Sequence, residues 1–111
     1  MIERKSKVFP KVGDKLYLQQ HTGNQFVDAV KRPYTVIAVT STLIQIQACK
    51  LIFNKPQHYD TLPDRIEADI NGEVLELYWA PSKGMWQIDK YKSGYPQYAY
   101  FGKWEYFPYL D

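Results

Sequence analysis

Short apolar stretches, interrupted at short intervals by Gly, Pro and Asn, dominate this chain of 111 residues. The stretches are rich in Val, Ile, Tyr and Trp, and many of them alternate apolar and polar residues with a period of two. This period is typical of β-strands, because successive side chains of a strand point to opposite faces. The sequence therefore predicts a mainly β fold with little helix.

The first two predicted strands lie within residues 15–40. The first covers Lys15 to Gln20 and places Leu16 and Leu18 on one face. The second covers Tyr34 to Thr40 and is apolar on both faces, which is typical of a central strand. The segment His21 to Pro33 between them is predicted to be a loop, and loops of that length are often functional.

Bends and turns are predicted further along. The segment Leu43 to Phe53 changes the phase of its apolar residues at Lys50, which indicates a bulge or sharp bend inside the strand. A hairpin is predicted from Glu73 to Ala80 and Met85 to Tyr91. Its turn, Pro81-Ser82-Lys83-Gly84, has Pro at a position that suits its fixed φ and Gly where a left-handed conformation is needed.

The segment between these elements is ambiguous. Asp64 to Ile70 alternates well enough for a strand, and Asn71-Gly72 would then form a type I′ hairpin turn. A short helical turn within residues 61–70 is the alternative. Five or six bent strands in such a chain predict a small bent-sheet or SH3-like barrel, with an OB-like barrel as the alternative.

Length and composition predict one β-rich domain over residues 1–111, since 45% of residues are hydrophobic and 23% are charged. No stretch approaches the roughly 18 apolar residues of a membrane helix, and the N-terminus lacks the apolar core of a signal peptide. Cys49 is the only cysteine, which fits a reducing compartment. We therefore expect a cytoplasmic protein with no membrane association.

Charge is unevenly placed along the chain. Residues 1–55 carry nine Lys and Arg against three Asp and Glu, whereas residues 56–111 carry five against nine. Such asymmetry can produce two faces of opposite sign, although folding can also intermix the halves and cancel the field.

Aromatic residues crowd the C-terminal part: the chain has ten Tyr, five Phe and three Trp, and half of these 18 fall between residues 91 and 109. Strand alternation would turn about half of such a run outward. Outward Tyr and Trp beside lysines are typical of a protein interface or of a stacking platform for unpaired bases. The alternative is that this tail closes the barrel and its rings cap the core. The candidate binding residues are Tyr95, Tyr98, Tyr100, Trp104, Tyr106, Lys90, Lys92 and Lys103.

The sequence favours a non-enzymatic binding module for a protein partner, with single-stranded nucleic-acid binding as the first alternative. A small enzyme or metal protein that uses His58, Asp60 and Asp64 is the second, although these residues lack the spacings of zinc or calcium sites. Cys49 lies in an apolar strand, where a thiol is more often a buried hydrophobe than a nucleophile. We predict no catalytic residue, metal ligand or cofactor.

Two stretches carry a resemblance. Lys11-Val12-Gly13-Asp14-Lys15, followed by Arg32-Pro33-Tyr34-Thr35-Val36-Ile37, resembles the opening of SH3-like barrels. With its ending Phe101-Gly102-Lys103-Trp104-Glu105-Tyr106-Phe107, the whole chain resembles short uncharacterised proteins of Gram-positive bacteria and their prophages or mobile elements. The resemblance implies a small barrel and brings no functional residue with it.

Overall fold

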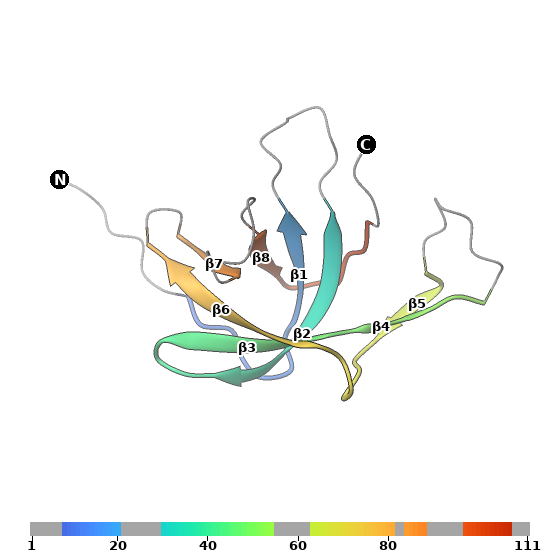
Figure 1. Ribbon diagram of the computed structural model, residues 1–111, viewed down its shortest axis with the longest axis horizontal. Coiled ribbons are helices and arrows are strands. Elements are labelled where there is room, and N and C mark those ends of the chain that lie inside the picture. Colours follow the sequence, from blue (N-terminus) through green and yellow to red (C-terminus); the bar gives the residue numbers. More distant parts are fainter. Residues whose placement is uncertain (1–7, 21–29, 55–62, 82–83, 89–96, 108–111) are drawn as a thin grey trace, which may run out of the picture.

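Six antiparallel strands close into a barrel, and two further strands form a small separate sheet (Figure 1). The computed structural model describes residues 8–20, 30–54, 63–81, 84–88 and 97–107, and over these residues it contains no helix. The barrel consists of β1 (Lys15–Gln20), β2 (Lys31–Val39), β3 (Leu43–Ala48), β6 (Val74–Ala80), β7 (Met85–Ile88) and β8 (Gln97–Phe101). The small sheet pairs β4 (Lys50–Ile52) with β5 (Arg65–Glu67).

This architecture confirms the predicted mainly β fold and is consistent with a small SH3-like or OB-like barrel. The barrel strands follow one another around the barrel in chain order, and the β4–β5 ribbon is an excursion between β3 and β6. Within the predicted ambiguous segment, residues 65–67 form a strand, and no helical turn occurs in the described residues 63–70.

The first strand confirms its prediction, and the second starts earlier than predicted. β2 begins at Lys31, so residues 31–33 belong to a strand and not to the predicted loop, whose residues 21–29 lie outside the described part. Pro33 is tolerated because β3 begins to pair with β2 only at Tyr34. The carbonyl of Pro33 accepts the N–H of Cys49 at 3.2 Å, so its nitrogen faces the side where the pairing with β3 ends and not the side of β1.

The predicted bend near Lys50 is confirmed, and it moves the chain from one sheet to another. β3 ends at Ala48, Cys49 interrupts the pairing, and β4 continues as part of the ribbon. The phase change therefore reflects two environments: Ile44 and Ile46 fill the barrel, whereas the residues after the bend are half-buried or exposed.

The predicted type I′ turn at Asn71-Gly72 is wrong. β5 pairs with β4 and not with β6, and no residue other than Gly13, Gly84 and Gly102 has a positive φ among the described residues. Gly72 is required for another reason, because a Cβ there would collide with the carbonyl oxygen of Ala48. The turn itself is held by the N–H of Gly72, which donates to the Asp69 carbonyl at 3.0 Å.

The predicted hairpin is confirmed as β6 and β7; residues 82–83 of its turn and 89–91 of its second strand lie outside the described part of the chain. Gly84 has a φ of 66°, as the left-handed turn position requires. Trp79 lies opposite Trp86, with their rings edge to face at 5.4 Å, and Leu77 lies opposite Ile88.

The core fills the barrel with side chains from all six of its strands. Trp86 extends it toward the N-terminal segment, since its indole N–H donates to the Val8 carbonyl at 2.7 Å and its ring meets Phe9 edge to face. The core cluster consists of Leu16, Leu18, Tyr34, Val36, Ile44, Ile46, Leu77, Trp86 and Ala99.

We expect Gly72→Ala to lower the free energy of unfolding by about 1–3 kcal/mol, because its methyl group would push against backbone of β3. Asn71→Ala is the matched control and should change stability by less than about 0.5 kcal/mol, since its residue is exposed. Urea unfolding measures both. Equal stability of the two variants would show that Gly72 is not in close contact with Ala48.

Candidate functional site

Strand β8 places the predicted aromatic residues by closing the barrel against β1. Five residue pairs join the two strands, including Leu18 with Ala99, Tyr17 with Tyr100 and Gln19 with Tyr98. Ala99 is buried at 5% exposure in the core, so its two tyrosine neighbours point to the outer surface. The tail therefore supplies the closing strand and also carries outward rings.

The outward rings of β1 and β8 pack against each other. Tyr17 and Tyr100 are stacked, with ring centroids 5.2 Å apart and planes inclined by 15°. The ammonium of Lys31 lies 5.5 Å from the Tyr17 ring centroid. Burial, followed by the neighbouring Tyr17 and Tyr98, raises the pKa of Tyr100 above its ordinary value.

After β8 the chain turns and crosses the outside of β1 and β2, as the red segment of Figure 1 shows. Gly102, at a φ of 114°, makes the turn, and its N–H donates to the Lys15 carbonyl at 2.8 Å. The indole N–H of Trp104 donates to the Tyr34 carbonyl at 2.9 Å. The Lys15 ammonium lies 4.4 Å from the Trp104 ring centroid, a cation–π geometry.

The segment also contacts the first residue of β2, through the backbone and through a side chain. Phe107 and Lys31 exchange two backbone hydrogen bonds, of 2.9 and 3.1 Å. Glu105 bridges two ammonium groups, those of Lys31 at 2.9 Å and Lys103 at 2.8 Å. The hydrogen bond from Lys103, and after it the one from Lys31, lowers the pKa of Glu105. In turn, the Glu105 carboxylate raises the pKa of Lys103.

We call this surface the aromatic face; it consists of Tyr17, Tyr98, Tyr100, Trp104, Lys15, Lys31 and Lys103. Of the residues predicted from sequence, Tyr98, Tyr100, Trp104 and Lys103 lie on it. Tyr106 lies beyond it and lines a pocket. Tyr95, Lys90 and Lys92 lie outside the described residues.

Sequence reasoning missed the contribution of β1 and β2 to this face. Tyr17 and Lys15 alternate with the buried Leu16 and Leu18, so their outward direction was readable from the first strand. What the sequence does not show is that β8 pairs with β1, which brings Tyr17 beside Tyr100.

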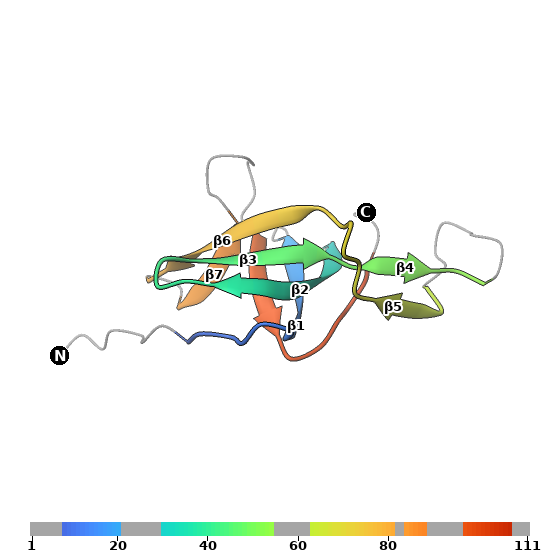
Figure 2. The ribbon, with the colours of Figure 1, turned by 90° about the horizontal axis from the view of Figure 1, so that it is seen from below.

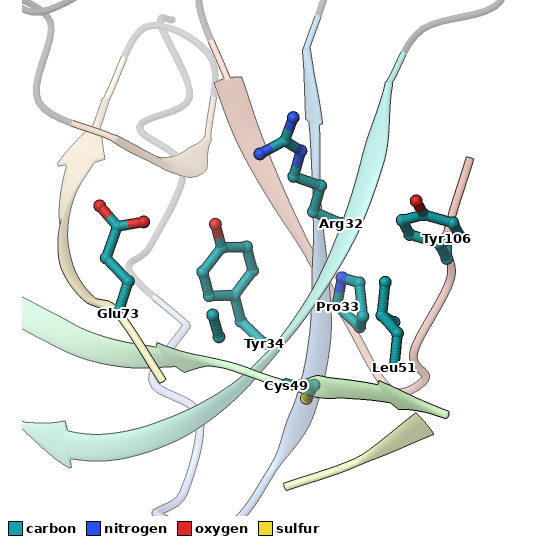
Figure 3. A pocket seen from close by; sticks show the side chains of 8 residues that line it. Arg32, Pro33, Tyr34, Cys49, Leu51, Glu73 and Tyr106 are labelled. Atoms are coloured by element: carbon teal, nitrogen blue, oxygen red, sulfur yellow. The ribbon is translucent and has the colours of Figure 1, made fainter. Parts of the chain in front are cut away.

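A pocket of about 360 Å³ opens where β3 leaves β2 (Figure 3). Arg32 and Glu73 flank the hydroxyl end of Tyr34, whose pKa is raised by burial. The Cys49 thiol lies 3.5 Å from the Thr35 hydroxyl, and burial raises its pKa, whereas a thiol that acts as a nucleophile has a lowered pKa. The remaining lining residues are Pro33, Ala48, Leu51 and Tyr106.

The predicted metal or acid–base alternative falls largely on residues that are not described, namely His58 and Asp60. Asp64 is described, and its carboxylate accepts the backbone N–H of Asn54 at 2.6 Å, which ties together the two strands of the ribbon. Within the described ranges, no group of three His, Cys, Asp or Glu is placed to hold a metal ion. No helix long and apolar enough to span a membrane occurs there either.

Neither protein-family models, curated proteins nor solved structures match this chain. The aromatic face concentrates more oriented rings and charges than the pocket does.

We expect Glu105→Gln to lower the free energy of unfolding at pH 7 by less than about 1 kcal/mol, since its ion pairs are at the surface. Because the pKa of Glu105 is lowered on folding, its stabilisation is fully present above the ordinary value of 4.5. It is lost as the pH falls through the lowered value. Unfolding curves of both proteins should therefore converge on acidification, and a difference that persists under strongly acidic conditions would contradict the bridge.

Proposed function

We propose that the protein is a non-enzymatic binding module that holds a protein partner on the aromatic face. The observation that carries this proposal is the locked, outward arrangement of Tyr17 and Tyr100. Tyrosine offers a large amphipathic contact area with few rotatable bonds, and rings that are already ordered lose little entropy when a partner binds. Preorganised rings of this kind are typical of interface hot spots.

The way the rings are covered favours a protein over single-stranded nucleic acid. A base stacks on an open ring face. One face of the Tyr17 ring packs on Tyr100, and Lys31 approaches the same ring; Lys15 lies over Trp104. Rings that are partly covered in this way suit the apolar side chains and peptide groups of a protein surface better than they suit a stacked base.

The charge of the aromatic face indicates which kind of partner surface it can bind. The aromatic face carries Lys15, Lys31 and Lys103, and Glu105 is the acidic residue that forms ion pairs with two of them. A partner with acidic side chains around an apolar centre would complement it, and attraction between the two would raise the association rate at low salt. The single half-buried cysteine is compatible with a reducing compartment and supports our proposal of a cytoplasmic location.

Affinity capture from cell extract with quantitative mass spectrometry tests the proposal. We expect the double variant Tyr98→Ala/Tyr100→Ala to recover the partner at least about tenfold less than the wild type, because it removes two anchoring rings. Tyr78→Ala is the matched control, since Tyr78 is an exposed tyrosine on β6, on the outside of another part of the barrel. Circular dichroism confirms that each variant is folded.

The same partners at the same yield for the double variant would contradict the proposal. A fluorescence titration with labelled single-stranded oligonucleotides at low and high salt addresses the nucleic-acid alternative. We expect no saturable binding at low salt. Tight, salt-dependent binding with quenching of tryptophan emission would replace the protein partner with a nucleic acid.

A further inference from the structure

Strand β5 has an edge that no described strand covers. The β4–β5 ribbon extends away from the barrel, which is clear in both Figure 1 and Figure 2. Within the described part of the chain, β5 pairs with β4 on one side and with no strand on the other. Two strands of three residues form a marginally stable sheet by themselves, and further strands would stabilise it.

The sequence of this edge is complementary to itself. β5 reads Arg65-Ile66-Glu67, and its two charged side chains are exposed and joined by a 2.8 Å ion pair along the strand. If two copies of β5 pair antiparallel about a two-fold axis at Ile66, Arg65 of each copy lies directly opposite Glu67 of the other. Opposite charges in such positions stabilise an antiparallel pair.

Charge alternation continues into the next strand. Lys50 lies opposite Glu67 within one chain. In the paired sheet, Lys50, Glu67 and Arg65 of the second copy would therefore lie side by side on the polar face. Each charge would have neighbours of the opposite sign. On the other face, Leu51 lies opposite Ile66, and both are half-buried. Pairing would extend this apolar row to the corresponding two residues of the second copy.

Other registers of the same edge are disfavoured. A shift by one residue would place the apolar row of one copy on the polar face of the other. A shift by two residues would place Arg65 opposite Arg65, or Glu67 opposite Glu67, and like charges in these positions are destabilising. The charges thus specify one register, and that register has closed two-fold symmetry.

We propose that the protein forms a homodimer in which β5 of one copy pairs antiparallel with β5 of a second copy about Ile66. The two ribbons then make one four-stranded sheet, ordered β4–β5–β5–β4, between two barrels. The aromatic face lies on β1, β8, the first residue of β2 and the crossing segment, residues 102–107, and takes no part in this contact. A dimer therefore presents two aromatic faces, which would strengthen binding to a partner with two sites.

Sedimentation velocity of the full chain tests the proposal across concentrations from about 10 μM to about 1 mM. We expect the wild type to show a concentration-dependent dimer. Arg65→Glu and Glu67→Arg each place like charges opposite one another, and each should raise the dimer dissociation constant by about tenfold or more. Lys11→Glu and Glu76→Arg are the matched controls, because they make the same charge changes at exposed residues away from the edge.

The decisive sample is an equimolar mixture of Arg65→Glu and Glu67→Arg. Their edges carry Glu-Ile-Glu and Arg-Ile-Arg and are complementary to each other, so the mixture should dimerise with a dissociation constant nearer to that of the wild type than to that of either variant. Recovery on mixing also shows that neither substitution has unfolded the ribbon. A wild type that stays monomeric at about 1 mM overturns the proposal, and so does a mixture that behaves like its separate components.

Discussion

The antiparallel pairing of β8 with β1 is the interaction on which the rest of the structure depends. It closes the barrel, and its register puts Ala99 opposite Leu18 inside the core. The tyrosines on either side of Ala99 are then forced outward, because a strand alternates its side chains between two faces. Among the described residues, β8 also pairs with β7 through Gln87 and Tyr98, whereas five pairs join it to β1, so the contact with β1 fixes where these rings lie.

The crossing segment, residues 102–107, turns that closing strand into an extended surface. The indole N–H of Trp104 donates to the backbone of β2, and Phe107 pairs with Lys31, the first residue of the same strand. The segment is therefore fixed at both ends by backbone contacts, and Glu105 ties two lysines together between them. Residues from the two ends of the sequence thus form one rigid face, and rigidity of this kind is what lowers the entropic cost of binding.

Local pattern predicted the strands, the bend near Lys50 and the hairpin with Gly84, because each follows from alternation or from one backbone conformation. It failed where long-range contact decides. Gly72 is needed because the chain passes close to β3 at this residue, whereas the Asn71-Gly72 pattern alone predicts a hairpin turn. For the candidate site, the sequence indicated the outward rings of β8, and it could not supply Tyr17, since the register between the first and last strands is a tertiary property.

Relaxation of aromatic ring protons by an inert paramagnetic co-solute, measured by nuclear magnetic resonance, tests the orientation of β8 most directly. Such a co-solute broadens the signals of solvent-facing protons and spares buried ones. The account predicts clear enhancement for the ring protons of Tyr98 and Tyr100, and little for those of Trp86, which is 2% exposed in the core. Enhancement of both tyrosine rings as weak as that of Trp86 would mean that these rings face inward, and would contradict the account of the aromatic face.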